Sequence, residues 1–505
     1  MDWLKDLPVL VLGLGDSGLA MARWCARHGA AVTVWDSREN PPGAAALAAE
    51  WPQAVRVGGE LLPSQLSGMQ LVLKSPGLSP LDARVAPLLN EARDSGIAIL
   101  NELDLFVRAL ADLKEAQGYA PQILAITGTN GKTTTTAMTA LLVERTGKRV
   151  AMAGNIGPTL LDTLTVKLEL PTEERPEVWV LELSSFQLDG VRNFEPAAAT
   201  VLNITQDHLD WHGTMPAYTA AKARVFGSRA LMVINRDDPA VEALVPAPVM
   251  VKGKLKLTDR AILRFGLDAP RRPGDFGLVE ENGMAWLVRA LPVDETIRRK
   301  KDEEEEIHLQ RLMPADALRV RGRHNAANAL AALALATAIG CPLAPMLHGL
   351  REYEGEPHRV QFVARVGDVE AYDDSKGTNV GATVAALNGL GADKAPGKLV
   401  VILGGDGKGQ DFAPLAEPLT RHARAVATIG RDAAAIETVL GLIPVQRHET
   451  LQAAVAWCFD QAQPGDAVLL SPACASLDMF RNYAHRAEVF VEAVTALAAD
   501  RGQAT

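Results

Sequence analysis

Cysteine is scarce in this chain, and the few cysteines form no recognisable pattern. The 505 residues include four, at Cys25, Cys341, Cys458 and Cys474. No two of them form a C-x-x-C pair or a metal-binding spacing, which argues against a disulfide-rich scaffold and against the common zinc sites. None is a strong candidate for a catalytic nucleophile. The cysteine content therefore predicts a reduced, intracellular protein.

Long apolar segments and clustered basic residues are also absent from the sequence. The longest apolar stretch, residues 326–341, is rich in alanine, contains Asn328 and Thr337, and is shorter than the roughly 20 residues that span a bilayer. It predicts a buried helix and no membrane insertion. The formal net charge of −10 argues against nucleic-acid partners and anionic membranes, which require clustered Lys and Arg. Residues 1–6 lack the features of a signal peptide, so we expect a cytoplasmic protein.

The most informative feature that is present is residues 122–134, where an apolar strand leads into a glycine-rich turn and a helix. Gly128 and Gly131 allow backbone N–H groups to face an anion. Lys132 adds a positive charge, and Thr133 offers a hydroxyl to Mg²⁺. The spacing is a variant of the G-x-x-x-x-G-K-[ST] loop, because isoleucine stands where the first glycine belongs. ATP or GTP is the expected ligand, and a turn that only caps a helix is the alternative.

A strand–helix–strand unit opens the chain. Residues 8–12 and 31–35 are short apolar segments typical of strands, separated by a G-x-G-x-x-G turn at 13–18 and a predicted helix. Asp36 follows the second strand. A glycine turn with an acid about 20 residues later is typical of a dinucleotide site, where the acid binds a ribose hydroxyl. The alternative is a tight turn that packs strand against helix without a ligand.

Strands alternate with helices in three successive units, which predicts an α/β fold with mainly parallel sheets covered on both faces. We place the units at residues 1–101, 102–355 and 356–505. Residues 112–121 have the composition of a linker between the first two units. Residues 268–310 break the alternation and contain the charged run KKDEEEE, which predicts a solvated, mobile insertion in the central unit.

Polar residues follow the predicted strands of the later units, and ligands bind at the carboxyl ends of such strands. Glu182 follows the strand at 178–181 and is expected near the phosphate loop, where it would bind Mg²⁺ or remain a solvated carboxylate. His208 follows the strand at 199–203, and a lone histidine is more often structural than a ligand. Lys222 has no role that the sequence alone assigns. In the third unit the loops at 404–408 and 471–478 are natural binding loops.

Taken together, these motifs resemble those of the Mur ligases, and among them the members that add D-glutamate. The segments that carry the resemblance span nearly the whole chain: TGTNGKT at 127–133, GNIG at 154–157, LELSSFQ at 181–187, DH at 207–208, HNAAN at 324–328, PHR at 357–359, DSKGTN at 374–379 and LSPACASLD at 470–478. The phosphate loop, the Glu and the His are shared with folylpolyglutamate ligases, whereas the last two segments are similar to the D-glutamate-adding members.

The resemblance implies a Rossmann-like N-terminal domain that binds UDP rather than NAD, a central P-loop-type ATP-binding domain, and a Rossmann-like C-terminal domain that binds D-glutamate and part of ATP. The residues implied for the UDP substrate are Gly15, Asp16, Ser17, Ser37, Arg38, Ser75, Gly77, Asn155 and His208. Those implied for ATP are Gly128, Thr129, Asn130, Gly131, Lys132, Thr133, Thr134, Asn325, Asn328, Arg359 and Asp374. From the residues alone, Asn155 lies in a substrate-contact turn or a plain Gly/Asn turn.

The resemblance also implies the catalytic residues Lys132, Glu182, His208 and Lys222. Thr133 and Glu182 would bind one Mg²⁺, and His208 with a carbamylated Lys222 would bind a second. The residues implied for D-glutamate are Lys376, Thr378, Lys408, Ser476, Leu477 and Tyr483. Two departures from the family pattern are the tyrosine at 483, where phenylalanine is expected, and the acidic insertion.

The implied reaction joins D-glutamate to UDP-N-acetylmuramoyl-L-alanine through an acyl phosphate, with ATP converted to ADP and phosphate, in cytoplasmic peptidoglycan precursor synthesis. A monomer is expected. One alternative is a related amide ligase, either a Mur ligase that adds another residue or a folylpolyglutamate synthase. A second alternative, from a different class, is a nucleotide-sensing binding module that hydrolyses ATP slowly.

Overall fold

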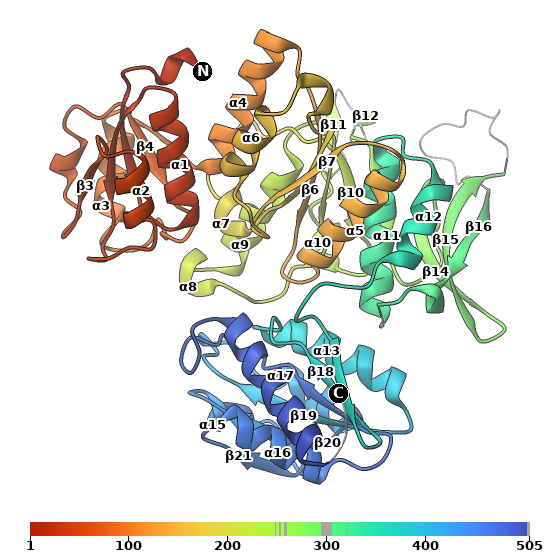
Figure 1. The fold of residues 1–505 in the computed structure, drawn as a ribbon. Helices are drawn as coiled ribbons and strands as arrows, with labels where there is room; N and C mark the ends of the chain where they lie inside the picture. Colours follow the sequence, from red (N-terminus) through yellow and green to blue (C-terminus); the bar gives the residue numbers. More distant parts are fainter. Residues whose placement is uncertain (248, 252–253, 257–259, 294–305, 321, 502–505) are drawn as a thin grey trace.

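The computed structural model describes residues 1–247, 249–251, 254–256, 260–293, 306–320 and 322–501, and it contains three lobes that follow one another along the chain (Figure 1). Each lobe contains a mainly parallel sheet with helices packed on it. The predicted α/β fold with three domains is confirmed. In the described residues, no helix is both long and apolar enough to cross a membrane.

The N-terminal domain has a five-stranded parallel sheet with the order β3-β2-β1-β4-β5. Its central strand is buried on both faces, which explains the uninterrupted apolar run in the sequence. The strands predicted at 8–12 and 31–35 are confirmed. The strands are β1 (Pro8–Leu12), β2 (Ala31–Trp35), β3 (Val55–Val57), β4 (Leu71–Lys74) and β5 (Ala98–Leu100), and the helices are α1 (Asp16–Arg27), α2 (Ala44–Glu50) and α3 (Ala86–Asp94).

The central domain has a six-stranded parallel sheet with the order β13-β10-β9-β6-β8-β7. Its strands are β6 (Gln122–Thr127), β7 (Val150–Gly154), β8 (Val178–Glu182), β9 (Ala198–Val201), β10 (Leu231–Asn235) and β13 (Ile262–Phe265), and a separate hairpin joins β11 (Val249–Val251) to β12 (Lys254–Lys256). Its helices are α4 (Glu102–Gln117), α5 (Lys132–Arg145), α6 (Leu160–Leu168), α7 (Ser185–Leu188), α8 (Leu209–His212), α9 (Met215–Ala223), α10 (Pro239–Glu242), α11 (Arg323–Ala338) and α12 (Leu343–Glu352). The buried helix predicted at 326–341 is confirmed as α11, whose residues 329–336 are fully buried.

The predicted linker at 112–121 is wrong over most of its length, because residues 112–117 belong to α4. Asn101 caps this helix: its side chain accepts a hydrogen bond from the Asp104 N–H at 3.1 Å, and the Asp104 carboxylate accepts one from the Asn101 N–H at 3.0 Å. Gly118 ends the helix in the left-handed conformation, at φ 69°. The apolar face of α4 is buried against α1 and α6, which outweighs the polar composition of its last turns.

The predicted solvated, mobile insertion at 268–310 is also wrong where the structure describes it. Three antiparallel strands form a separate sheet: β14 (Phe276–Glu281), β15 (Met284–Pro292) and β16 (Ile307–Pro314). Phe276, Leu287 and Val288 are fully buried in it. The signal of this sheet is the two apolar segments, FGLV at 276–279 and MAWLVRALP at 284–292, which an acidic turn separates. Most of the charged run, residues 300–305, lies outside the described residues.

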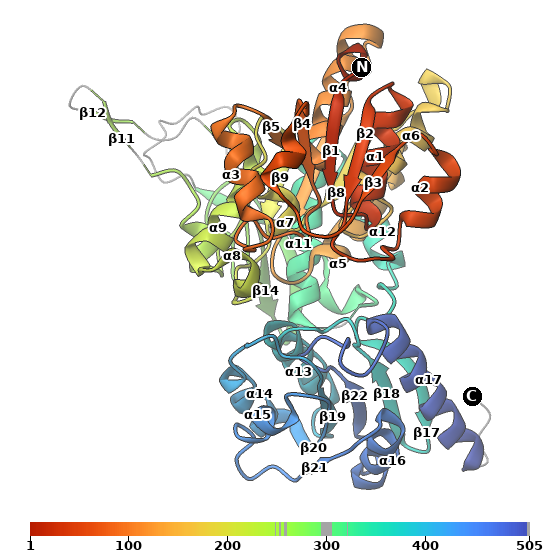
Figure 2. The ribbon, with the colours of Figure 1, turned by 90° about the vertical axis from the view of Figure 1, so that its left-hand side faces the viewer.

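The C-terminal domain has a six-stranded sheet with the order β17-β18-β22-β19-β20-β21, in which only β17 is antiparallel to its neighbour. Its strands are β17 (Gln361–Val366), β18 (Val369–Asp373), β19 (Leu399–Gly404), β20 (Ala423–Ile429), β21 (Val445–Arg447) and β22 (Ala467–Leu470), and its helices are α13 (Val380–Lys394), α14 (Ala416–His422), α15 (Ala433–Glu437), α16 (Leu451–Gln461) and α17 (Tyr483–Asp500). Helix α13 contacts α11, so this domain presents the loops before α13 to the central domain (Figure 2).

Candidate active site

The glycine-rich loop lies between β6 and α5, as predicted. Gly131 has a φ of 81° and precedes the first helical residue, so the loop turns sharply where the helix N-terminus begins. A Cβ atom at this position would lie 2.6 Å from Oδ1 of Asn328. Glycine is therefore required both by the left-handed backbone and by the close approach of the amide. The loop N–H groups and the helix N-terminus together form a site for an anion.

Lys132 lies over the loop that it follows. Its Nζ donates hydrogen bonds to the carbonyl oxygens of Gly128 at 2.9 Å and Thr129 at 2.8 Å. Burial lowers the pKa of Lys132, while the carboxylates of Glu182 and Asp207 raise it. This half-buried ammonium is held by neutral carbonyls and has no ion-pair partner among the described residues, and a phosphate would supply a counter-ion.

Glu182 ends β8 next to the loop, because β8 pairs in parallel with β6. The side chain is 1% exposed. Its Oε1 accepts a hydrogen bond from Nδ2 of Asn155 at 2.6 Å, and its Oε2 is buried without a hydrogen-bond donor from the described residues. A buried carboxylate oxygen without a partner is unfavourable, and a metal ion would satisfy it. The predicted proximity of Glu182 to the phosphate loop is therefore confirmed, and the structure adds Asn155 to this group.

His208 is the N-cap residue of α8 and has a left-handed backbone, at φ 54°. Its Nε2 lies 3.4 Å from Oδ2 of Asp207, and its ring centroid lies 4.6 Å from that of Phe186. Burial lowers the pKa of His208, Asp207 raises it, and the charge of Lys408 in the C-terminal domain lowers it further. The net effect favours the neutral imidazole at neutral pH, the form that binds metal ions.

Lys222 is a buried lysine on α9, with 2% of its surface exposed. Its Nζ donates a hydrogen bond to the Gly128 carbonyl at 2.8 Å and lies 4.6 Å from the ring centroid of Tyr218. Burial lowers the pKa of Lys222 well below its ordinary value, and the nearby charge of Lys132 lowers it further. The neutral amine is therefore favoured, and sequence reasoning from the residues alone gave no sign of this.

Side chains of the C-terminal domain reach the same place. Nη2 of Arg359 donates a hydrogen bond to Oγ1 of Thr133 at 3.0 Å, and Nζ of Lys376 lies 3.4 Å from the same oxygen. Nδ2 of Asn379 donates a hydrogen bond to Oδ1 of Asn130 at 3.1 Å. The structure therefore joins the third domain directly to the phosphate loop.

Four of the residues predicted for ATP, Asn325, Asn328, Arg359 and Asp374, line two adjoining cavities, the larger of about 790 Å³. Asn325 and Arg359 line both. Asp374 borders the smaller cavity, and burial raises its pKa to about 7 although Oγ of Ser471 donates a hydrogen bond to it at 2.6 Å. The smaller cavity is lined by Asn130, Gly131, Thr134, Val320, His324, Asn325, Asn328, Gly355, Glu356, Arg359, Val360, Asp374, Ala382, Ala385 and Ala386.

Seven of the residues predicted for the UDP substrate line one cavity of about 430 Å³ in the N-terminal domain, namely Gly15, Asp16, Ser17, Ser37, Arg38, Ser75 and Gly77. Asp36 also borders it, but its carboxylate is fully occupied. Oδ2 accepts from the Leu14 N–H and from Nη2 of Arg38, and Oδ1 accepts from the backbone N–H and Nε of Arg38. Burial alone would raise the pKa of Asp36, and these hydrogen bonds lower it to about 2. Asp36 therefore has no free acceptor for the ribose hydroxyl of a dinucleotide.

The residues predicted for D-glutamate lie on loops at the carboxyl edge of the third sheet and at the start of α17. Nζ of Lys376 lies 5.5 Å from the ring centroid of Tyr483. The loops carrying Lys408 and Ser476 are adjacent, because the backbones of residues 406 and 475 exchange two hydrogen bonds. Ser476 is buried, whereas Leu477 is 72% exposed. Thr378 lies between Lys376 and the N-cap of α13.

Sequence reasoning missed several residues of this site. Asn203 holds the phosphate loop: its Oδ1 accepts from the Asn130 N–H at 2.8 Å, and its Nδ2 donates to the Asn130 carbonyl at 3.1 Å. Its position after β9 is the same signal that identified Glu182. Asn379 and its contact with Asn130 gave no comparable signal, because the two residues are distant in sequence.

Comparison with known families gives three consecutive matches. The model for the "Mur ligase MurD-like, N-terminal domain" matches residues 8–101, that for the "Mur ligase middle domain" matches 126–336, and that for the "Mur ligase, glutamate ligase domain" matches 358–474. These ranges follow the three lobes of the structure.

Relatives of high identity match over their full length. The UDP-N-acetylmuramoylalanine--D-glutamate ligase of Albidiferax ferrireducens is 61% identical over 508 residues, covering 100% of this chain and 99% of that protein. The protein of the same name from Burkholderia pseudomallei is 57% identical, with 98% of each chain covered. Among solved structures, a MurF ligase from Thermotoga maritima in complex with ADP has a TM-score of 0.60 at 16% identity, covering 99% of this chain and 100% of that one. The last likeness concerns the fold alone.

Proposed function

The chain belongs to the Mur ligase family, and from this premise we propose that it joins D-glutamate to UDP-N-acetylmuramoyl-L-alanine in an ATP-dependent reaction that releases ADP and phosphate. The observation that carries the proposal is the meeting at Thr133 of the phosphate loop with Arg359 and Lys376. An ATP site of the central domain and an amino-acid site of the C-terminal domain would share this point. A phosphorylated carboxylate formed there lies within reach of an amine held by the C-terminal domain.

The reaction needs activation, because a carboxylate is a poor electrophile. Transfer of the γ-phosphoryl group of ATP to the L-alanyl carboxylate gives an acyl phosphate, and the amine of D-glutamate then displaces phosphate to form the amide. In this scheme Lys132 and Arg359 offset the negative charge that gathers between the triphosphate and the carboxylate. No residue of the chain needs to form a covalent intermediate. The close packing of the C-terminal domain on the loop would exclude water from the acyl phosphate.

Magnesium fits the donors near the loop. The unpartnered Oε2 of Glu182 is a hard oxygen ligand of the kind that Mg²⁺ prefers, and His208 is favoured in its neutral form. The hydroxyl of Thr133 is a second hard oxygen, and it would exchange the hydrogen bonds that it accepts from Arg359 and Lys376 for the ion. We propose that Thr133 and Glu182 bind one ion and that His208 and Lys222 bind a second. When bound, these ions would neutralise phosphate charge and orient the phosphoryl group for transfer.

Carbamylation of Lys222 is supported by its surroundings. Only a neutral amine attacks CO₂, and burial favours the neutral form of Lys222. In that reaction the amine nitrogen bonds to the carbon of CO₂ and loses a proton, which leaves an anionic carbamate. The carbamate oxygens would extend from the buried side chain beyond the position of Nζ, which is 2.8 Å from the Gly128 carbonyl. The modified residue is thereby an oxygen ligand rather than a competing cation.

The N-terminal domain is proposed to bind the UDP part of the substrate in the 430 Å³ cavity, with Asp16 and Ser17 near the diphosphate and Ser37 and Arg38 near the uracil. The saturated carboxylate of Asp36 argues against a dehydrogenase with NAD at this site. In the C-terminal domain, Lys376, Thr378, Lys408, Ser476, Leu477 and Tyr483 are proposed to bind D-glutamate. The tyrosine hydroxyl at 483 would extend closer to the substrate than the family's phenylalanine.

A coupled assay of ADP release tests the proposal. We expect turnover only with ATP, Mg²⁺, UDP-N-acetylmuramoyl-L-alanine and D-glutamate all present, and a product that contains the new amide. Lys132→Ala should nearly abolish it, whereas Lys114→Ala, an exposed lysine on α4, should not change it. Phosphate release without amide product would favour the nucleotide-sensing module, and activity with a different amino acid or with folates would favour the related ligases. We further propose that the protein works as a cytoplasmic monomer, which sedimentation of the purified protein would test for the oligomeric state.

A further inference from the structure

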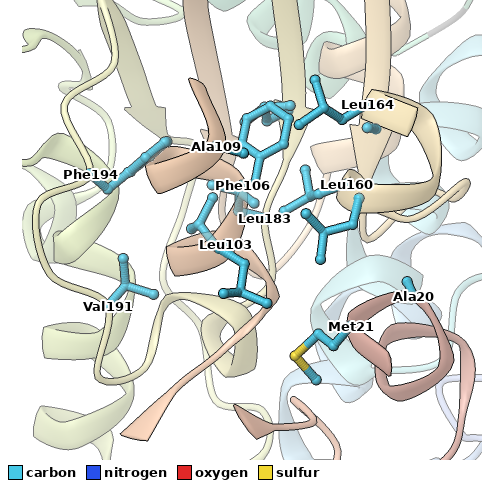
Figure 3. Close-up of a cluster of buried hydrophobic side chains, with 14 of the residues drawn as sticks. Ala20, Met21, Leu103, Phe106, Ala109, Leu160, Leu164, Leu183, Val191 and Phe194 are labelled. Carbon is cyan, nitrogen blue, oxygen red and sulfur yellow. The ribbon is translucent and has the colours of Figure 1, made fainter. Parts of the chain in front are cut away.

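The contacts between the N-terminal domain and the central domain include two that involve different elements. In the first, α1 packs against α4 and α6 through an apolar cluster that includes Ala20, Met21, Leu103, Leu160 and Leu164 (Figure 3). In the second, the segment that follows β4 packs against α8. The first contact fixes one side of the domain, and the second lies next to the loop of the UDP cavity.

The second contact is built around Lys74 and Trp211. Nζ of Lys74 lies 5.0 Å from the ring centroid of Trp211 and donates a hydrogen bond to the Leu78 carbonyl at 2.9 Å. Oγ of Ser79 donates a hydrogen bond to the Trp211 carbonyl at 2.8 Å. Both Lys74 and Trp211 are 7% exposed. An ammonium over the face of an indole is attracted to it, most strongly when both are shielded from water.

On this side of the domain junction, Nδ2 of Asn101 also donates a hydrogen bond to the Gln187 carbonyl at 2.9 Å. A cavity of about 540 Å³ lies between the domains, and Lys74 forms part of its wall together with Leu89, Arg93 and Asn101 of the N-terminal domain and Asp189 of the central domain. Across the described residues, Lys74 has no carboxylate within ion-pair distance. Burial lowers the pKa of Lys74 to about 8, although the charge of Asp189 acts in the opposite direction. The burial of this ammonium is therefore offset by the indole face, by the Leu78 carbonyl and by the charge of Asp189.

Each partner of the contact is next to a residue proposed to bind the UDP substrate. Lys74 immediately precedes Ser75, which borders the UDP cavity. Trp211 lies on the four-residue helix that His208 caps, and the ring of Phe186 contacts both, at centroid distances of 4.9 Å from Trp211 and 4.6 Å from His208. The substrate must extend from the UDP cavity to His208, so its two ends are held by two domains.

We propose that Lys74 and Trp211 are positioning residues that keep the UDP-binding loop at residues 75–77 aligned with His208. This inference rests on the proposed function. A substrate that spans two domains binds with an affinity reduced by the fraction of molecules in which the domains are correctly aligned. Loss of the contact lowers that fraction, and the KM for the UDP substrate rises. ATP and D-glutamate bind to the other two domains, and their KM values are unaffected.

Kinetics of Lys74→Met, Trp211→Leu and the double variant test the inference. Lys74→Met keeps the length of the side chain without its charge, and Trp211→Leu removes the ring face. Each should raise the KM for the UDP substrate by about fivefold to thirtyfold, the range from an exposed to a shielded cation–π contact. KM values for ATP and D-glutamate should stay within about twofold. The double variant should be no worse than either single variant, since both remove the same contact.

Two conservative variants separate positioning from general destabilisation. Lys74→Arg retains a cation over the indole and should restore most of the affinity. Trp211→Phe retains a ring face, and the Nε1 of Trp211 has no acceptor among the described residues, so no hydrogen bond is lost. Additive effects in the double variant, an unchanged KM for the UDP substrate, or equal increases in all three KM values would overturn the inference.

Hydrogen exchange of the ligand-free protein gives a measurement that does not depend on the reaction. Amides at 75–81 and 209–213 should exchange faster in Lys74→Met than in the wild type, while those of α1 and α6 should not change. If exchange at both segments is faster in Lys74→Met but the wild type has no ligase activity, the role of the contact in aligning the domains is supported and the proposed function is wrong. If the wild type is fully active but Lys74→Met shows the same exchange rates as the wild type at both segments, the contact is not a positioning element.

Discussion

Arg359 and Thr133 are 226 positions apart in the chain, yet Nη2 of the arginine donates a hydrogen bond to the threonine Oγ1 at 3.0 Å. Thr133 lies in the first turn of α5, directly after the glycine-rich loop, and Arg359 lies at the start of the C-terminal domain. Nε of Arg359 is buried without an acceptor among the described residues. A phosphate oxygen placed against the loop would supply that acceptor.

Arg359→Ala should therefore lower kcat/KM by about 100-fold or more, a loss of about 3 kcal/mol in transition-state stabilisation. Arg359→Lys should recover only part of this, because one ammonium cannot reach two acceptors as a guanidinium does. Steady-state kinetics with varied ATP measures both. Thermal unfolding of the two variants should match the wild type. A variant with wild-type kinetics would remove Arg359 from the nucleotide site.

Lys222→Ala should be almost inactive, because it removes a proposed metal ligand. Short carboxylates such as formate or acetate should restore part of the activity by replacing the lost carbamate oxygens. Lys222→Met should behave in the same way, whereas Lys167→Ala, a lysine at the end of α6, should retain full activity without added carboxylate. Activity assayed with and without added carboxylate gives the answer. Full activity of Lys222→Ala, or no response to any carboxylate, would contradict the carbamate.

Ser476→Ala and Lys408→Ala should each raise the KM for D-glutamate at least about tenfold, since each removes a hydrogen-bond donor to its carboxylates. The KM values for ATP and the UDP substrate should change little. L-glutamate should fail as a substrate, because inversion at the α-carbon redirects the amine when both carboxylates are held. Initial rates with each substrate varied in turn provide the test. Defects confined to the KM for ATP would reassign these residues to the nucleotide.

Glu102 should make the stability of the protein depend on pH. Burial raises the pKa of Glu102 to about 7, although the Leu161 N–H, which donates to it at 3.0 Å, acts in the opposite direction. Between the ordinary pKa and this value the folded protein binds more protons than the unfolded chain, so stability falls as the pH rises. Above about pH 7 the loss approaches, at most, about 3 kcal/mol.

Glu102→Gln removes this titration and should raise the Tm relative to the wild type at pH 8 but not at pH 5. Thermal unfolding at the two pH values measures the difference. Glu115→Gln, an exposed glutamate on the same helix, is the matched control and should shift neither value. An equal effect of Glu102→Gln at both pH values would show that Glu102 does not change its protonation state between pH 5 and pH 8.

Short apolar segments in the sequence were enough to predict individual strands. The strands at 8–12 and 31–35 are continuous apolar segments between polar turns, and the structure has them with the same limits. Glu182 was identified as a site residue because it ends such a strand, and parallel pairing placed it at the loop. These predictions needed only the periodicity of the chain and the general rule for carboxyl ends of strands.

The two wrong predictions concern segments whose local composition differs from the pattern of the longer segment around them. Polar composition favoured a linker at 112–121, but the capping box at Asn101 and Asp104 and the apolar face of α4 determine the structure there. Charge near residue 300 favoured a solvated insertion, but the apolar segments before it form the antiparallel strands β14 and β15. The contact of Arg359 with Thr133 joins two domains, so no pattern within either segment predicts it.

Residues 353–360 form the single covalent connection between α12 and β17, and Arg359 belongs to it. If Arg359 binds the phosphates as proposed, the segment that connects the two domains also binds the nucleotide. A rotation of the C-terminal domain would then displace the arginine from the phosphates directly, because no other element lies between the connecting segment and the nucleotide. Domain opening and ADP dissociation would then occur in the same step, so the rate of ADP release would equal the rate of domain opening.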